Sequence, residues 1–340
     1  MFSLGVLFSP SMRFVVRFLA VLTSALVVSW TTGALFFDGP SLILVGLQFL
    51  VILAVFFFVR GWKRKLSLVC LWFVMVLAWW LMLEPRSDRN WQPDVAQTAW
   101  AEVHGDDVTL HNVRNFEHRT ATDFTPQWET RTVHLSQITA IDVAVCYWGS
   151  ECIAHPIASF QFADSPPVCF SIETRKEVGE SYSALRGFFR QYELIYVVVD
   201  ERDAIRLRTN VRTSEEVYLY RLKTPPDRAR GHFLDYIAAL NELHDQPRWY
   251  NAATANCTTS IRSQQVSDKR DPWDWRIVIN GKIDELLFER GDLKTDGVSF
   301  PELKAKSLIN EAANAAGDKP DFSKRLRFPR PGFSSLPASS

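Results

Sequence analysis

Three long apolar runs occupy the first quarter of the chain. They cover about residues 18–37, 41–59 and 66–83, and each approaches the roughly 20 residues that a helix needs to cross the hydrocarbon core of a bilayer. The runs carry no charge on any face, which argues against buried helices of a soluble protein. A cleaved signal peptide would explain the first run alone, but two further runs follow and no small-residue cleavage site is evident. We therefore expect three transmembrane helices within residues 1–85.

Shorter patterns follow the apolar runs. Alternating apolar and polar positions predict strands at about 107–114, 130–134, 139–147, 155–162, 168–175, 193–199, 204–208 and 216–222. Helical spacing predicts helices at about 181–190, 228–244, 256–266, 281–289 and 301–315. Strands in the middle and helices at the end indicate an α+β domain over residues 86–317. Residues 318–340 are rich in Pro and Ser, and we expect an extended tail there.

The distribution of charge gives the membrane segment an orientation. The chain has 38 Lys and Arg and 38 Asp and Glu. Six bases and two acids lie in residues 1–85, which leaves 32 bases and 36 acids for residues 86–340. The six bases precede the first apolar run or separate the second from the third, so the positive-inside bias puts both places in the cytoplasm. We expect a multi-pass protein of the bacterial inner membrane with its soluble domain in the periplasm. The soluble domain has no basic surplus, which excludes general nucleic-acid binding.

The cysteines fit an exported domain without a metal site. One of the five cysteines, Cys70, lies in the third apolar run, and Cys146, Cys152, Cys169 and Cys257 follow in the soluble part. Disulfides persist in oxidising compartments, and Cys146 and Cys152 are close enough to pair around a loop. The sequence does not determine whether Cys169 forms a disulfide, or with which cysteine. No Cys-x-x-Cys pair and no His and Cys cluster has the spacing of zinc ligands, so we expect neither a metal nor a cofactor.

The stretch PRWYNAATANCTTSIR at 247–262 carries the most informative candidate for chemistry. Cys257 stands at the start of a predicted helix, with Asn256 as its N-cap and Thr258 in its first turn. The free N–H groups and the dipole of a helix N-terminus favour a thiolate and can hold an oxyanion. A small buried cysteine at a helix start fits the same pattern, and the residues alone leave both interpretations open.

A thiol nucleophile needs a base, and His155 is the best placed of the seven histidines. It opens the strand HPIASFQF, whose partner in a predicted hairpin is VCFSIETRK. A hairpin centred near residues 164–165 places His155 opposite Glu173, with about 5 Å between the Cβ atoms. Glu173 can then orient the imidazole toward Cys257, which is the logic of a catalytic triad. A structural histidine, and a solvated or Arg175-paired Glu173, are the alternatives.

Three further residues have weaker claims. Tyr250 would line a pocket beside Cys257 or pack behind its helix, and Arg175 shares the predicted face of Glu173. Arg114, in NVRNFEHR, could bind a carboxylate or phosphate through two hydrogen bonds, but the favoured interpretation of this stretch is an exposed charged strand. The sequence contains no Walker-type loop, GxGxxG, HExxH or GxSxG motif.

Several of these stretches together resemble one bacterial family. They are NVRNF (112–116), AHPIASFQF (154–162), FSIETRKE (170–177), YELIYVVVDERDAIRLRT (192–209) and WYNAATANCTT (249–259). They resemble, in order, the Lnb N-terminal periplasmic domain family, formerly a domain of unknown function. The resemblance spans most of residues 87–270. It implies acyl transfer to the amino terminus of a lipoprotein, with Cys257 and His155 as the catalytic pair.

The order of the two residues also resembles the permuted papain-like NlpC superfamily, which includes enzymes similar to lecithin:retinol acyltransferase. This likeness concerns the arrangement of the two catalytic residues and not the sequence. It implies a papain-like catalytic domain after the three transmembrane helices. The expectation is a periplasmic thiol acyltransferase that acts on a membrane lipid or lipoprotein at the inner membrane. A cysteine amidase or peptidase of the cell envelope and a non-catalytic binding protein are the alternatives.

Overall fold

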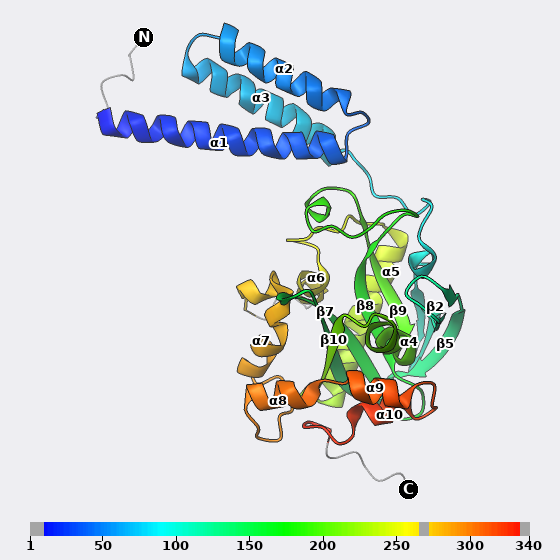
Figure 1. The fold of residues 1–340 in the computed structure, drawn as a ribbon. Coiled ribbons are helices and arrows are strands. Elements are labelled where there is room, and N and C mark those ends of the chain that lie inside the picture. Colours follow the sequence, from blue (N-terminus) through cyan, green and yellow to red (C-terminus); the bar gives the residue numbers. More distant parts are fainter. Residues whose placement is uncertain (1–9, 265–271, 334–340) are drawn as a thin grey trace. The chain divides into compact units, whose positions relative to one another are not determined.

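The structure is a computed structural model that describes residues 10–264 and 272–333 (Figure 1). Its contacts divide the chain into two compact units. One consists of the residues up to Arg86 together with Ser183–Tyr192, and the other of the remaining residues. The chain passes between the units after Arg86, after Tyr182 and after Tyr192, so one segment of the second half of the sequence folds with the N-terminal helices.

The first unit contains three apolar helices, α1 (Pro10–Phe37), α2 (Ile43–Phe58) and α3 (Trp62–Leu81). Among the described residues, α1 and α3 are long and apolar enough to cross a membrane, and α2 is shorter, with 16 residues. Helices thus form at all three predicted places. Only two reach the usual length of a span, and the three-span arrangement remains a prediction.

A polar contact joins the three helices within their apolar surroundings. Gln48 of α2 is fully buried. Its amide nitrogen donates to the hydroxyl of Thr32 in α1 at 2.6 Å, and its amide oxygen accepts from the indole N–H of Trp72 in α3 at 2.8 Å. Polar side chains that satisfy one another in this way hold apolar helices in a fixed register.

In the described part of the second unit, eight strands form one sheet with the order β1-β2-β9-β8-β7-β6-β10, and β5 also pairs with β2. All neighbours are antiparallel except β2 and β9. The strands are β1 (Trp100–His104), β2 (Asp107–Arg114), β5 (Trp128–His134), β6 (Ile138–Trp148), β7 (Ser150–Phe162), β8 (Val168–Arg175), β9 (Glu193–Asp200) and β10 (Glu215–Arg221), with a separate pair β3 (Glu117–His118) and β4 (Phe124–Thr125).

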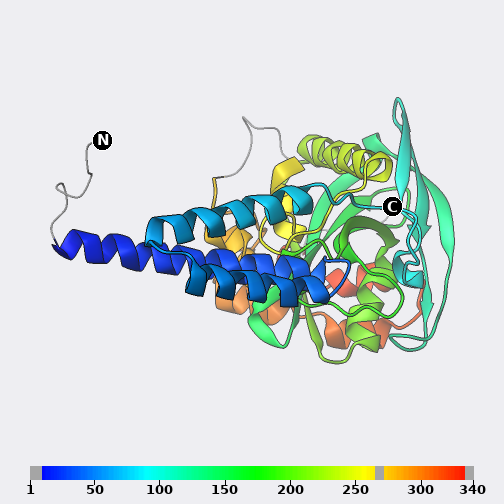
Figure 2. The ribbon, with the colours of Figure 1, turned by 90° about the horizontal axis from the view of Figure 1, so that it is seen from above.

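Helices cover both faces of this sheet (Figures 1 and 2). They are α4 (Glu201–Arg206), α5 (Pro226–Asp245), α6 (Cys257–Gln264), α7 (Ile283–Glu289), α8 (Phe300–Ser307), α9 (Asn310–Ala316) and α10 (Phe322–Arg327). On one face, Phe233 of α5 packs against Phe160 and Phe170 of the sheet. On the other face, Ile157 joins a core that includes Leu326 of α10 and residues of α4 and α9. The unit is therefore an α+β domain, as the sequence predicted.

Two local predictions were wrong. Residues 204–208 are not a strand: they belong to α4 and to the π-helical turn η5 (Leu207–Val211). The side chain of Asp200 caps this helix by accepting from the backbone N–H of Arg202 at 2.9 Å, and the apolar side chains that seemed to alternate lie on the buried face of a helix. Residues 181–190 form only one short 3-10 turn, η4 (Arg186–Phe188), instead of a helix.

The segment from residue 318 to 333 also differs from the extended tail that we expected. It contains α10, and Phe322, Leu326 and Phe333 are almost fully buried in the core. Apolar residues spaced four apart put Phe322 and Leu326 on one face of this short helix. The described part contains three of the four prolines of residues 318–340 but only one of the five serines, and the other four serines lie within 334–340, outside the described residues.

Candidate active site

Cys257 is the first residue of α6, as the sequence predicted, and is 5% exposed. Asn256 caps the helix, because its side-chain oxygen accepts from the backbone N–H of Thr259 at 2.9 Å. The hydroxyl of Thr258 bonds to the carbonyl of Ile277 and lies 2.9 Å from the same oxygen of Asn256. Thr258 therefore fixes the first turn of α6 in place rather than lining an open pocket.

Burial raises the pKa of the Cys257 thiol above its ordinary value. Hydrogen bonds from the side chain of Asn280 and from the backbone N–H of Thr258 act in the opposite direction, and the negative charge of Glu173 adds to the increase. The Asn280 amide donates to the sulfur at 3.3 Å. The N–H donors that we expected at a helix start are thus present, but in this structure burial outweighs them and the resting sulfur is a thiol.

His155 lies in the β7–β8 hairpin, whose register agrees with the prediction. Ile157 pairs with Ser171 and Ser159 with Cys169, so the hairpin is centred on residue 164. The paired residues of the ladder end at Ile157, and the same register continued by two residues sets His155 against Glu173. The imidazole Nε2 lies 3.8 Å from the Glu173 carboxylate. The sequence therefore located both residues and the contact between them.

A serine that we did not single out connects the two side chains. The hydroxyl of Ser171 donates to Glu173 Oε1 at 2.6 Å. The oxygen of this Ser171 hydroxyl also lies 2.7 Å from His155 Nε2. Because the only hydroxyl proton points to Glu173, Ser171 must accept the hydrogen bond from the imidazole. The arrangement therefore puts the proton of His155 on Nε2 and leaves the lone pair on Nδ1. We call His155, Ser171 and Glu173 the histidine relay.

An arginine fixes the charge at the end of the relay. Arg208 donates to Glu173 Oε1 at 3.3 Å and to Glu215 at 3.0 Å. Burial alone would raise the pKa of Glu173, but the Arg208 guanidinium and, less strongly, His155 hold it well below its usual range. Burial and the positive charge of Arg208 lower the pKa of His155 to about 3, against the opposite effect of Glu173. The imidazole is therefore neutral at physiological pH.

One side chain links the cysteine to the histidine strand. Asn280 belongs to the short helix η8 (Asn280–Lys282); its amide nitrogen donates to Cys257, and its amide oxygen accepts from the backbone N–H of Ala154 at 3.3 Å. Ala154 directly precedes His155. Helix α6 also packs beside β7 and β8. Among the described residues, however, no hydrogen bond joins Cys257 to His155, and such bonds are often long or absent without a substrate.

The other candidate residues lie elsewhere. Tyr250 is buried with its ring 6.5 Å from that of Tyr182. Arg175 donates to the carbonyls of Val95 and Ala96 at 3.0 and 2.7 Å. Its guanidinium also lies 4.3 Å from the centre of the Trp91 ring. The contacts of Arg175 thus hold the chain at the entry to the domain and do not include Glu173.

Arg114 is not on an exposed strand. It is 4% exposed, and its guanidinium makes two hydrogen bonds to Asp203, at 3.0 and 3.2 Å. Arg114 thus binds a carboxylate through two hydrogen bonds, as its residue type suggested, but this carboxylate is Asp203 of the same domain and not a ligand. Asp203 also accepts from the backbone N–H of Phe116 and lies 3.0 Å from His118 Nε2, which makes this a buried structural cluster.

All five cysteines carry free thiols. The disulfide considered between Cys146 and Cys152 is not formed, because Cys146 points into the core opposite His155 whereas Cys152 is exposed. Burial raises the pKa of Cys146 to about 12, which makes it a poor nucleophile. Within residues 10–264 and 272–333, no group of three or more His, Cys, Asp and Glu side chains is arranged to hold a metal ion.

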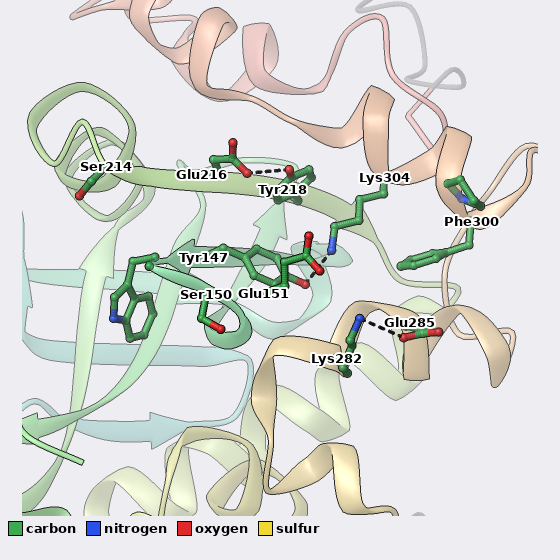
Figure 3. Close-up of a pocket in the computed structure, with 13 residues that line it drawn as sticks. Tyr147, Ser150, Glu151, Ser214, Glu216, Tyr218, Lys282, Glu285, Phe300 and Lys304 are labelled. Atoms are coloured by element: carbon green, nitrogen blue, oxygen red, sulfur yellow. Dashed lines mark hydrogen bonds and ion pairs between the residues drawn. The ribbon is translucent and has the colours of Figure 1, made fainter. Parts of the chain in front are cut away.

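Two cavities flank the candidate site. The larger, of about 590 Å³, is lined by the turn between β6 and β7 and by parts of β10, η8, α7 and α8 (Figure 3). Lys304, which lines it, donates from its ammonium to Tyr147 at 3.1 Å and pairs with the buried carboxylate of Asp284 at 3.0 Å. Cys257 does not line it. The smaller cavity, of about 210 Å³, includes Ala255 and Ser260 and therefore adjoins the helix of Cys257.

Taken together, these features define an α+β domain with a buried cysteine at a helix start and a neutral histidine held by a Ser–Glu relay. The family described as the Lnb N-terminal periplasmic domain matches residues 124–281. The match contains the relay, Cys257 and Asn280, and it confirms the family resemblance over that stretch. It fits, with α1 and α3, a periplasmic protein of the cell envelope that is anchored to the membrane. No curated protein and no solved structure matches the chain.

Proposed function

We propose that the chain is a membrane-anchored periplasmic thiol acyltransferase in which Cys257 is the nucleophile and His155 the general base. Glu173, through Ser171, is the group that orients His155. The acyl donor would be a membrane phospholipid or a lipoprotein ester, and the acceptor an amine such as the amino terminus of a lipoprotein. The papain-like character of the site is part of this proposal.

The observation that carries the proposal is the chain of hydrogen bonds from His155 through Ser171 to Glu173. A base that serves a thiol needs an unprotonated nitrogen and a second nitrogen that holds the ring in place. The hydrogen bond from Nε2–H to Ser171 supplies the second nitrogen and leaves Nδ1 as the acceptor. The chain ends on the Glu173 carboxylate, which can hold the ring in this orientation as the third member of a triad does.

The reaction proceeds in two transfers. Nδ1 of His155 takes the thiol proton while the Cys257 sulfur forms a bond to the ester carbonyl carbon. The ester C–O bond breaks, and the leaving alkoxide takes the proton back from the imidazolium, which leaves a thioester. The acceptor amine then attacks the thioester, the C–S bond breaks, and His155 carries the amine proton to the departing thiolate. Asn280 and the backbone N–H of Thr258, which surround the sulfur, are the donors available to a developing oxyanion.

The low pKa of His155 and the raised pKa of Cys257 mean that the resting pair is uncharged. Proton transfer would then accompany the attack on the substrate instead of preceding it. A substrate that brings the thiol and Nδ1 together, and excludes water from them, would supply the missing contact.

The geometry of the helices supports membrane anchoring with three spans. Trp30 of α1 packs its ring against Phe73 and Trp80 of α3, and the indole N–H of Trp80, at the end of α3, donates to Asp38, just after α1, at 2.7 Å. The two longer helices thus end at the same level. Two spans that end on one side of a bilayer need a return crossing between them, and α2 is the segment available for it.

The proposal is tested by reconstituting the purified full chain in vesicles that contain a phospholipid with a labelled acyl chain. A diacylated peptide with an N-terminal lipidated cysteine is the acceptor. We expect label to move to the peptide amine with the wild type and not with Cys257→Ala or His155→Ala. Cys152→Ser, which changes an exposed thiol, is the matched control and should keep the activity.

The hydrolase alternative gives a different outcome in the same experiment. Release of labelled fatty acid by the wild type but not by Cys257→Ala, without transfer to the peptide, would assign water as the acceptor. Equal turnover by the wild type and Cys257→Ala would contradict thiol chemistry altogether.

A further inference from the structure

The segment Ser183–Tyr192 lies between β8 and β9 in sequence but belongs to the unit of the N-terminal helices. The proposed chemistry does not use it. Its contacts nevertheless fix its position against the C-terminal ends of α1 and α3.

Asp38 is the centre of these contacts. The carboxylate accepts from the indole N–H of Trp80 at 2.7 Å, from the backbone N–H of Arg190 at 3.2 Å and from the side-chain amide of Gln191 at 2.8 Å. The Arg190 guanidinium also lies 4.3 Å from the centre of the Trp80 ring. One acidic side chain thus ties the end of α1, the end of α3 and the segment to one another.

Apolar packing adds a second attachment. Phe189 is 8% exposed, and its ring centroid lies 4.9 Å from that of Phe37 in the last turn of α1. The ring rests on Gly33, where an added Cβ would lie only 2.3 Å from the end of the ring. The glycine therefore allows the segment to lie directly on the surface of α1.

Two large apolar side chains of the same segment are exposed. Leu185 is 61% exposed and Phe188 is 48% exposed, although Phe189 beside them is buried. Large apolar side chains left on a surface next to one another mark an interaction site. Arg190 of the same segment lies over the ring of Trp80, and tryptophan is a side chain that settles at the boundary between lipid and water.

We propose that Leu185 and Phe188 insert into the membrane leaflet at the C-terminal ends of α1 and α3. The partner is lipid, at the boundary between head groups and acyl chains, because the segment continues the ends of two helices whose own exposed side chains are apolar. This inference rests on the membrane anchoring in the proposed function and is independent of the chemistry of Cys257. It gives the unit of the N-terminal helices a lipid contact in addition to the spans.

The test places an environment-sensitive fluorophore at residue 185 of the full chain. Leu185→Cys is made in a background in which the two exposed cysteines, Cys70 and Cys152, are serine, and the labelled protein is reconstituted in phosphatidylcholine and phosphatidylglycerol vesicles. We expect a shallow spin-labelled lipid to remove roughly half of the fluorescence and aqueous iodide to remove little, because a side chain at the acyl boundary is in contact with lipid. The parent without Leu185→Cys corrects for label on buried thiols.

Two control positions separate the possible failures. A probe at Leu50 of α2, which is 64% exposed, reports whether the helices are in the bilayer, and a probe at the exposed Lys319 reports an aqueous position. Iodide quenching at residue 185 equal to that at residue 319, with the residue 50 probe in lipid, would overturn the inference and leave the anchoring intact. Protection of residue 185 from both quenchers would overturn it in favour of a protein partner. Iodide access at residue 50 would overturn both the anchoring and the inference.

Discussion

At the scale of single residues, the histidine relay determines what His155 can do. The ring is neutral, its Nε2–H is committed to Ser171, and the charge at the end of the chain is held on Glu173 by Arg208. Each of these features favours a base at Nδ1 over an imidazolium. Ser171 is the part of the relay that can be removed with the smallest change in volume.

Ser171→Ala should therefore lower the rate of thioester formation by on the order of 10- to 100-fold, because the ring loses the group that fixes its tautomer and orientation. The measurement is single-turnover acylation of the full chain in vesicles. Ser165→Ala is the matched control, since Ser165 lies in the turn of the same hairpin and its buried hydroxyl has no hydrogen-bond partner among the described residues. Equal rates for both variants would show that the relay does not orient the base.

The low pKa of His155 also predicts how stability depends on pH. The group is neutral when folded, with a pKa of about 3, and has an ordinary pKa of 6.5 when unfolded. The unfolded chain thus binds the proton first, and the stabilisation present above pH 6.5 is lost progressively as the pH falls toward 3. Between pH 7 and pH 5 this amounts to about 2 kcal/mol. His155→Gln should remove that part of the pH dependence.

The comparison uses urea unfolding of the full chain in detergent, followed by tryptophan fluorescence, at pH 7 and pH 5. His104→Gln, which changes a histidine that is 76% exposed in its side chain, should keep the pH dependence of the wild type. A pH dependence in His155→Gln that matches the wild type would mean that the imidazole is not held neutral in the folded protein.

At the scale of elements, alternation correctly predicted the hairpin that carries His155 and Glu173. The β7–β8 hairpin has apolar Phe160 and Phe170 on one face and His155 and Glu173 on the other, so its register could be read from the sequence. The N-cap at Asn256 was equally predictable, because the residue types of a helix start are specific. Both features depend on contacts that are local in sequence.

The features that we missed depend on contacts that are distant in sequence. Asn280 reaches Cys257 across 23 residues, and nothing in its own neighbourhood indicates that role. Arg175 seemed to be the partner of Glu173 because both lie on the same predicted face of the strand. The guanidinium that contacts Glu173 is instead that of Arg208, which lies in the turn η5, in a stretch that we predicted as a strand. Ser171 lay on the predicted face, and only its distances identify it as the link.

The helix α10 shows how a distant contact stabilises an element that local sequence did not suggest. Arg327 is 3% exposed, and its guanidinium donates to Asp142 at 2.8 Å and to Glu201 at 2.6 and 2.9 Å. Both carboxylates are buried. Arg327→Ala should lower the free energy of unfolding by about 3–5 kcal/mol, because it leaves two buried charges with too few partners.

Arg325→Ala is the control for this prediction. Arg325 lies in the same helix, is about half exposed and pairs with Asp321 one turn away, and such surface pairs contribute little to stability. The same urea titration measures both variants. Similar losses in the two would show that the segment after residue 317 is held by something other than the buried ion pairs.

At the scale of the whole molecule, an apolar helical unit and an α+β unit share one chain. The first unit presents a surface suited to lipid, and the second holds a thiol and a histidine relay within the stretch that matches the Lnb N-terminal periplasmic domain. A thiol that works on acyl chains benefits from continuous attachment to the membrane, because the local concentration of its donor is then high. The combination accounts for both units with one function.

The most direct test of that function is the mass of the intact protein, purified from its membrane, beside Cys257→Ala. The account predicts an added mass of fatty-acyl size on the wild type that hydroxylamine removes and that is absent from Cys257→Ala. An acyl adduct of the same mass on both proteins, or a Cys257 thiol that carries no adduct and resists alkylation after the protein has been exposed to phospholipid, would contradict it.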